Sequence, residues 1–180
     1  MNKPLILFGI CFSIFLQTSA QQNRLKGEII QDFGGFFVVE QPDIKTDTSA
    51  VFKIIFDVSK TSEDKNILNK QIATAARFLN MHANVGIAKK NLKVALTIHA
   101  NAWQDVLNNK AYNEKFGVDN PNLKLIEALS EAGVDIILCG QTAVRRGLNK
   151  KNVIPSVKFA LSAMTAQLQY QNNGYIYLKL

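Results

Sequence analysis

The sequence predicts an α/β protein whose doubly wound, mainly parallel sheet of five strands carries helices on both faces. Two observations predict this fold class. From Val51 onward, short apolar runs alternate with segments whose apolar residues have the 3.6-residue period of a helix. The chain has 180 residues, whereas an eight-fold barrel takes about 250 residues. Because strands and helices in this order need right-handed crossovers, we expect an open sheet with helices covering both faces.

The first strand and the first helix follow Val51. Residues 51–58 are β-branched, aromatic and almost continuously apolar, which is typical of a strand buried on both faces. Thr61 and Asp64 have the spacing of a capping box and predict that a helix starts there. The helix is expected to end before Gly86. Its apolar face is expected to comprise Leu68, Ile72, Ala75, Ala76 and Leu79.

The second strand and the second helix come next. Residues 92–99 predict a strand that ends at His99, and residues 100–119 are polar and are expected to be irregular. Asn120-Pro121 supplies an N-cap and the proline that helices favour at their first position. A helix is therefore predicted from there to Gly133.

A third strand, short and apolar, is predicted over residues 134–138, directly before Cys139. Residues 141–147 predict one or two helical turns. The remaining predicted elements are a strand at 157–159, a helix at 161–171 and a closing strand at 175–180.

The amino-terminal residues have the pattern of a signal peptide. Lys3 gives a short positive start, residues 5–16 form an apolar core, and Thr18-Ser19-Ala20 supplies the small residues that signal peptidase needs. The apolar run is shorter than the roughly 20 residues that span a bilayer. We therefore expect cleavage near Ala20 and an exported protein, periplasmic or secreted, that is not held in the membrane after cleavage. The alternative is a segment that stays uncleaved as an anchor.

The mature chain is expected to have two parts. Residues 51–180 contain the alternating pattern and form the α/β domain. Residues 21–50 are an extension, and we expect it to pack on that domain with one short extended piece, because Phe36 and Phe37 would otherwise form an exposed apolar patch.

Charge and motifs exclude several function classes. The formal net charge of +7 favours acidic partners, but the basic residues are scattered without aromatic interleaving, so we expect no nucleic-acid partner. No glycine-rich phosphate or dinucleotide motif follows the first strand, and no Gly-x-Ser-x-Gly elbow occurs. The histidines are His82 and His99, and no spacing resembles a zinc site, so we expect neither a metal nor a cofactor.

Cys139 is the candidate nucleophile. Cys11 would leave with the signal peptide, so the mature protein would carry Cys139 as its single thiol and have no internal disulfide. The amides of Gly140, Gln141 and Thr142 are expected to point toward its sulfur from the start of the next helix and to stabilise a thiolate. The alternative is a buried cysteine that acts as a small apolar residue at a strand end.

Other polar side chains are expected beside this cysteine, because the carboxyl ends of parallel strands meet at one edge of a sheet. His99 is a candidate general base for the sulfur, or else a residue bonded to local backbone. Asp57 either accepts from His99 or caps the following loop, and Asn101 either orients a ligand or forms a turn. The candidate ligand-binding residues are therefore Asp57, Asn101, Gly140, Gln141 and Thr142.

Several segments carry a family resemblance. They are FKIIFDV at residues 52–58, LKVALTIHA at 92–100, LSEAGVDIILCGQTAVRRG at 129–147, and the tail at 153–169 with Gly174-Tyr175-Ile176. On these segments, residues 51–180 resemble the DsrE/DsrF-like family. The resemblance implies a five-stranded, mainly parallel sheet, homo-oligomers, and a sulfur relay in which Cys139 accepts persulfide sulfur. His99 matches a position that is often histidine in similar sequences.

Two functions stay open on the sequence alone. The first is a sulfur-relay protein, a sulfurtransferase-like sulfur carrier whose partners are a sulfur donor and an acceptor thiol. Predicted export departs from the best understood relay members, which are intracellular. The second is a non-catalytic module that binds a small ligand or a partner protein in the same crevice.

Overall fold

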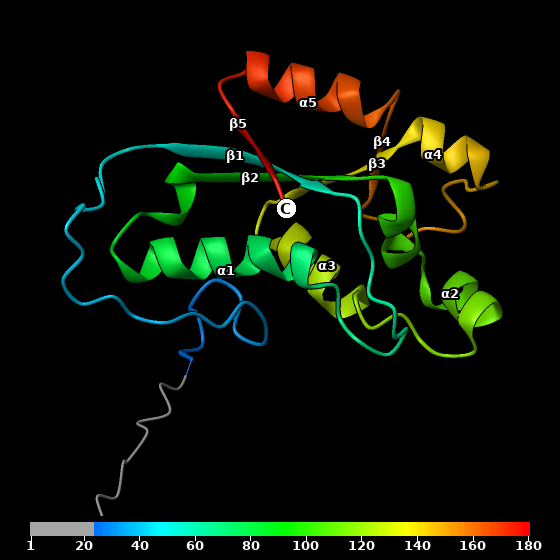
Figure 1. The fold of residues 1–180 in the computed structure, drawn as a ribbon, viewed down its shortest axis with the longest axis horizontal. Coiled ribbons are helices and arrows are strands. Elements are labelled where there is room, and N and C mark those ends of the chain that lie inside the picture. Colours follow the sequence, from blue (N-terminus) through cyan, green and yellow to red (C-terminus); the bar gives the residue numbers. More distant parts are fainter. Residues whose placement is uncertain (1–23) are drawn as a thin grey trace, which may run out of the picture.

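A computed structural model describes residues 24–180, so the predicted signal peptide and its cleavage site lie outside the described residues. The strands form one sheet in which every pair is parallel, in the order β4-β3-β2-β1-β5 (Figure 1). The predicted fold class is thus confirmed. The strands are β1 (Phe52–Val58), β2 (Leu92–Ile98), β3 (Asp135–Cys139), β4 (Lys158–Ala160) and β5 (Ile176–Lys179).

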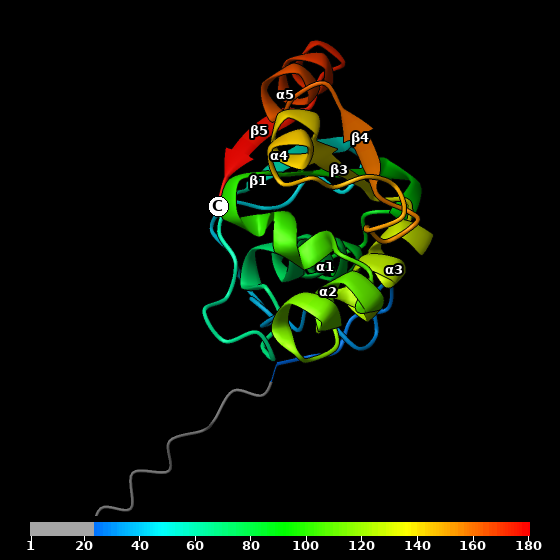
Figure 2. The same ribbon diagram turned by 90° about the vertical axis from the view of Figure 1, so that its right-hand side faces the viewer.

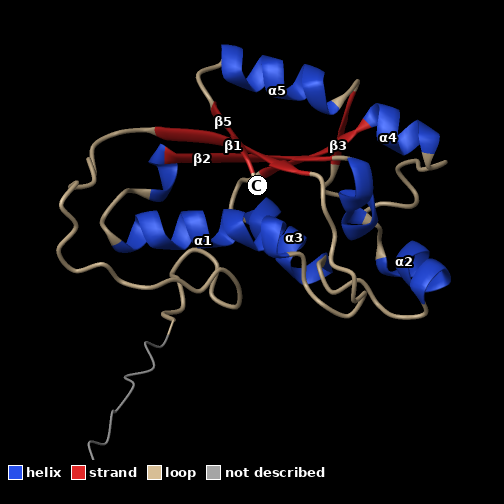
Figure 3. Ribbon diagram, in the orientation of Figure 1, coloured by secondary structure: helices blue, strands red, loops and turns tan. Residues whose placement is uncertain are grey.

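Helices cover both faces of the sheet, as Figures 2 and 3 show. α1 (Lys70–Asn84), α2 (Asn109–Phe116) and α3 (Leu123–Glu131) lie on one side, and α5 (Ala163–Asn172) lies on the other. α4 (Gly140–Arg145) follows the carboxyl end of β3. Short 3-10 helices, η1 (Lys89–Asn91) and η2 (Ala100–Val106), stand before and after β2. Among the helices of residues 24–180, none has the length and apolar character that crossing a bilayer requires.

The hydrophobic cores on the two faces of the sheet differ in size. The main hydrophobic core lies between the sheet and the α1 and α3 layer. On the other face, a small cluster of Ile55, Ala95, Ile137 and Ala166 packs the sheet against α5. In the part of the chain that the structure describes, α5 is the helix that packs on this second face, and its outer side stays exposed.

The first helix starts later than the capping box predicts. α1 begins at Lys70, and Asn69 is its N-cap, with a side chain that accepts from the Gln71 amide. The hydroxyl of Thr61 does not cap this helix, because it donates to the buried carboxylate of Asp105 at 2.8 Å. The predicted start was therefore wrong. The predicted apolar face is correct within the helix, where Ile72, Ala75, Ala76 and Leu79 are buried.

The segment predicted to be irregular, residues 100–119, contains η2 and α2. Asn108 caps α2 by accepting from the Ala111 amide. The helix escapes an apolar-period search because Tyr112 is its one buried side chain. The next helix, α3, begins at Leu123, since Asn120 uses its side-chain oxygen on the amide of Asn122 in the preceding turn.

The amino-terminal arm of residues 24–50 packs on α1. Ile30 and Phe36 are buried, whereas Phe37 is 45% exposed, contrary to the expectation that both phenylalanines are covered. Asn80 of α1 holds the arm, because its side chain accepts from the Ile30 amide and donates to the carbonyls of Ile30 and Phe33. The extended pairing in the arm is a single antiparallel bridge between Leu25 and Phe36.

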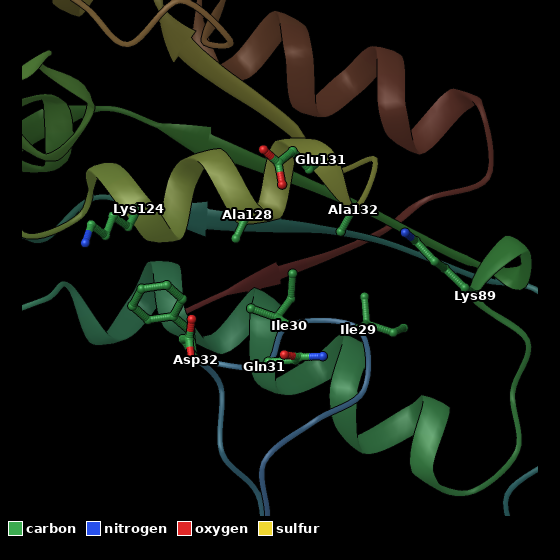
Figure 4. A pocket seen from close by; sticks show the side chains of 10 residues that line it. Ile29, Ile30, Gln31, Asp32, Lys89, Lys124, Ala128, Glu131 and Ala132 are labelled. Carbon is green, nitrogen blue, oxygen red and sulfur yellow. The ribbon is translucent and has the colours of Figure 1, made fainter.

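A groove of about 600 Å³ lies between this arm and α3 (Figure 4). Its apolar lining includes Ile30 and Ala128, and its charged lining includes Lys124 and Glu131. The groove belongs to the α1 and α3 side of the sheet, opposite the α5 face.

Candidate functional site

The candidate site residues gather at the carboxyl edge of the sheet, on the face that α5 covers. Side chains alternate along a strand, so Asp57 and His99 point to the same face as Ile55 and Ala95. Cys139 follows Ile137 in the same way. The β2–β3 register pairs Ile98 with Leu138, which makes His99 and Cys139 the next neighbours across the two strands. Sequence reasoning placed the three side chains at one edge, and the sheet order puts their strands side by side.

Asp57 is the anchor of a buried hydrogen-bond network. Asp57 is 5% exposed, and its carboxylate accepts from His99 Nε2 at 2.8 Å, Gln167 Nε2 at 2.9 Å and the Tyr177 hydroxyl at 3.0 Å. Thr97 adds a longer contact at 3.4 Å. A buried carboxylate without such donors would be costly, so the network compensates its desolvation and ties β1, β2, β5 and α5 together.

The Asp57 contact also fixes how the His99 ring is used. Of the two roles expected for Asp57, accepting from His99 is the one that the geometry supports. Because a carboxylate only accepts hydrogen bonds, Nε2 carries the proton, and Nδ1 is left as the nitrogen that can accept one. The imidazole is partly exposed, with 28% of its side chain accessible. The Nε2 contact with Asp57 therefore orients the His99 ring, and Nδ1 is left to accept a hydrogen bond or a proton.

Cys139 lies where the amino ends of two helices meet. It is the N-cap of α4 and is 7% exposed. Burial raises the pKa of its thiol, but the amide and hydroxyl of Thr142 and the amides of Ala163 and Gln141 stabilise the thiolate. The net result is a pKa below the ordinary value. Amides from the first turn of α4 were expected here, whereas the amide of Ala163 from α5 was not.

Gly140 lets these two helix ends come together. A Cβ at this position would lie 2.4 Å from the carbonyl oxygen of Ala160 and 3.0 Å from that of Leu161. Gln141 strengthens the same contact, because its side-chain amide donates to the Leu161 carbonyl at 3.3 Å. The start of α4 therefore rests directly on the backbone that leads from β4 into α5.

The remaining predicted residue, Asn101, is not joined to this cluster. It lies exposed in η2, and its backbone amide donates to the Ser59 carbonyl at 3.0 Å. The sharp turn before it places Ala100 in the left-handed region, at φ +46°. Among the hydrogen bonds of residues 24–180, none joins the His99 ring to the Cys139 sulfur. Within the same range, no group of three His, Cys, Asp or Glu side chains is arranged to hold a metal ion.

Sequence reasoning missed three members of the Asp57 network. Thr97 reads as an ordinary strand residue, Gln167 as the solvent side of a helix, and Tyr177 as part of an edge strand. Gln167 and Tyr177 reach Asp57 across 110 and 120 residues of sequence, respectively. No local pattern marks such contacts, and only the strand order reveals them.

Comparison with known proteins decides the family. A model of the DsrE/DsrF-like family matches residues 51–180. The chain belongs to the DsrE/DsrF-like family. The match covers every strand and helix described above and leaves out the arm. Membership fits a sulfur-relay role in general terms.

Solved structures show the same fold. The protein MTH1491 of Methanobacterium thermoautotrophicum, described as of unknown function, is 12% identical, with a TM-score of 0.54 over 72% of this chain and 99% of its own. The ychN protein of E. coli is 17% identical, with a TM-score of 0.54 over 72% of this chain and 99% of its own. A comparison with curated proteins found no match. At these identities the two structures support the DsrE-like fold and say nothing of the chemistry.

Proposed function

We propose that this protein is a sulfur carrier in which the Cys139 thiolate accepts sulfane sulfur, holds it as a persulfide and passes it to an acceptor thiol. The observation that carries the proposal is the convergence of the amides of Gln141, Thr142 and Ala163 on the sulfur, with the lowered pKa that follows. A thiolate is the nucleophilic form of cysteine, and the same amides stabilise the charge of a persulfide anion.

Two displacements make up the proposed cycle. The Cys139 thiolate attacks the outer sulfur of a donor persulfide, the donor S–S bond breaks, and the donor leaves as a thiolate. The acceptor thiolate then attacks the outer sulfur of the Cys139 persulfide and takes it away, which regenerates the Cys139 thiolate. No net oxidation or reduction occurs in either step.

His99 is the proposed general base for the acceptor. Its free Nδ1 can take the proton from an incoming thiol, while Asp57 keeps the ring in one tautomer through Nε2. His99 and Cys139 occupy neighbouring positions across β2 and β3, so a thiol that approaches the sulfur passes close to the imidazole. Asp57 is then a positioning residue that acts through His99.

Mass spectrometry tests the transfer. The mature protein is incubated with polysulfide and its intact mass is measured, since Cys139 is expected to be its single thiol. We expect a mass increase of one sulfur, lost on addition of an acceptor thiol. The Cys139→Ala variant should gain nothing, and a wild-type protein that stays unmodified would rule out the carrier role.

A second candidate is a non-catalytic module that binds a small ligand or a partner. The observation that favours it is the low exposure of Cys139, 7%, which limits attack on bulky donors. This candidate predicts that Cys139→Ser keeps any ligand-induced rise in melting temperature. The sulfur-carrier proposal predicts that the rise caused by polysulfide disappears with the thiol.

We further propose that the carrier is exported and forms a homo-oligomer. Support for export is the signal-peptide pattern that ends at Ala20. Support for the oligomer is the exposed outer side of α5, where Met164 and Leu168 are 71% and 62% exposed, together with Leu161 just before the helix, which is 72% exposed.

A further inference from the structure

The positive charge of the chain is concentrated in its last quarter. Residues 136–180 contain six lysines and arginines and no aspartate or glutamate, whereas residues 1–135 contain 15 basic and 14 acidic residues. Four of the six, Arg145, Arg146, Lys150 and Lys151, lie at the end of α4 and in the loop that follows it. The excess charge therefore begins within a few residues of Cys139, at the carboxyl edge of the sheet.

Two cations converge on one tryptophan at this edge. Arg146 from the end of α4 and Lys115 from α2 each lie 5.4 Å from the centre of the Trp103 ring. Trp103 belongs to η2 and is only 6% exposed, so it provides a fixed aromatic surface for both charges. Cation–π contacts of this kind hold a flexible basic side chain in place.

Within residues 24–180, neither cation forms an ion pair with an acidic side chain. The ion pairs within residues 24–180 are His99–Asp57 and Lys158–Asp135, and neither includes Lys115 or Arg146. Glu114 lines the same cleft but forms no ion pair with either one. Two like charges held at one ring repel each other, and an anion bound between them would relieve that repulsion.

The cleft that they border combines this charge with apolar surface. It has a volume of about 370 Å³, and its lining includes Leu107, Ala111 and Leu148 beside Trp103, Lys115 and Arg146. A bare phosphate or carboxylate ion would leave the apolar part unused. Single-stranded nucleic acid needs open aromatic faces for stacking, and the Trp103 ring is buried and covered by cations.

We propose that this cleft docks an acidic segment of a partner protein, with carboxylates on Arg146 and Lys115 and an apolar side chain between them. The distance to the thiol suits a sulfur acceptor. Arg146 follows Cys139 by seven residues, so it lies about 10 Å farther along the axis of α4, a span that about three extended residues cover. An acceptor cysteine about three residues from the acidic stretch would reach the sulfur. This delivery role rests on the proposed function, whereas the docking itself does not.

Peptide binding tests the docking. A fluorescein-labelled peptide of alternating Glu and Leu is titrated with the full mature protein at low ionic strength, and its anisotropy is recorded. Arg146→Glu and Lys115→Glu should each weaken binding about tenfold or more, since each replaces an attraction by a repulsion. Glu114→Gln should strengthen binding. Lys90→Glu changes the net charge equally but lies in η1, at the amino edge of the sheet, and should leave affinity within about twofold.

Three outcomes would overturn the docking surface: no binding of the Glu-Leu peptide, equal binding of a Gln-Leu peptide, or equal losses in Arg146→Glu and Lys90→Glu. The same proteins are tested with an RNA oligonucleotide and with phosphatidylglycerol vesicles. If either probe binds in a way that depends on Arg146 while the peptide does not bind, the surface belongs to another class of partner and the peptide-docking proposal is wrong. The titration is repeated with Cys139→Ala, whose affinity should be unchanged.

The delivery role is measured separately. A peptide with cysteine three residues from its Glu-Leu stretch should take sulfur from the Cys139 persulfide at least tenfold faster than the same peptide with Gln for Glu, and Arg146→Glu should abolish the difference. Peptide binding without any sulfur transfer would refute the sulfur-carrier proposal and leave the docking surface standing. Equal transfer to both peptides would refute delivery through the cleft.

Discussion

Thr142 is the residue that contributes most to the stabilisation of the Cys139 thiolate, because it supplies both a backbone amide and a hydroxyl. Thr142→Val removes the hydroxyl and keeps the shape of the side chain. We expect the pKa of Cys139 to rise, and the midpoint of its alkylation by iodoacetamide to move to higher pH. Thr74→Val, the same change on α1, serves as the control. A midpoint equal in wild type and Thr142→Val would show that the hydroxyl does not stabilise the thiolate.

Asp105 makes a separate contribution, to the pH dependence of stability. Burial raises the pKa of its carboxyl to about 6, despite hydrogen bonds from Asn69, Thr61 and Asn122 and the charge of Lys65, which lower it. The folded protein therefore binds this proton more tightly than the unfolded chain, whose carboxyl has a pKa near 3.8. Its stabilising effect is complete below about pH 4 and is lost as pH rises through about 6, a change of about 3 kcal/mol.

Asp105→Asn isolates this effect from the other carboxyl groups. The amide does not titrate, but its NH2 group would face either Asn69 or Asn122, each of which also donates, so the variant is less stable overall. In urea unfolding, the stability of wild type minus that of Asp105→Asn should fall by about 3 kcal/mol between pH 4 and pH 7. Asp119→Asn, the same change at an exposed position, serves as the control. A flat difference for Asp105→Asn would contradict the raised pKa.

At the scale of elements, the contact between the start of α4 and the β4–α5 connection depends on Gly140. Alanine there would bring its Cβ to 2.4 Å from a backbone oxygen, so one of the two segments must move. We expect Gly140→Ala to cost about 1–3 kcal/mol in the free energy of unfolding and to slow alkylation of Cys139 at pH 7, because the amides of α4 and α5 separate. Gly147→Ala meets open space at φ +66°, and should lower stability without changing the alkylation rate. Equal alkylation in both variants would show that this packing is unnecessary for the thiolate.

The helices and strands that could be predicted from sequence are those that bury an apolar face, because burial leaves a periodic pattern of apolar residues. The strand at Phe52–Val58 is buried at its carboxyl half, and the apolar run marked it. The capping box at Thr61 failed because Asp105, which lies 44 residues away, takes its hydroxyl, and no local pattern reports that competitor. α2 was missed because it buries a single side chain and therefore shows no apolar period.

In the candidate site, too, local pattern predicted some positions, and contacts between distant segments were missed. The alternation of strands and helices was enough to place Asp57, His99 and Cys139 at one edge, since parallel strands end on the same side. It did not place the α5 amide of Ala163 at the sulfur, or Gln167 at Asp57. Both of those contacts depend on how α5 lies across the sheet, which sequence spacing does not record.

At the scale of the whole molecule, the sheet is covered unequally. Within residues 24–180, the α1 and α3 side is covered by helices and then by the arm, whereas a single layer, α5, packs on the side that holds the thiol. The positive charge of residues 136–180 lies in the part of the chain that contains Cys139, α4 and α5. The proposed thiol chemistry therefore lies on the thinner side, whereas the proposed docking cleft includes Lys115 of α2 and Trp103, which packs in the main core. The thicker side, with its arm, supplies most of the buried core.

We expect the outer side of α5 to be the interface between copies of this chain. Met164 and Leu168 lie one turn apart on α5, and with Leu161, just before the helix, they form an exposed apolar stripe, which monomeric proteins rarely leave uncovered. A second copy of this chain can cover it symmetrically, stripe against stripe. We therefore expect light scattering after gel filtration to give an oligomer for wild type and a smaller species for the Met164→Glu/Leu168→Glu variant. Ile44→Glu, at an arm position that is 89% exposed, should keep the wild-type mass. A monomeric wild-type protein, or an oligomer that the double variant leaves intact, would show that this stripe is not the interface.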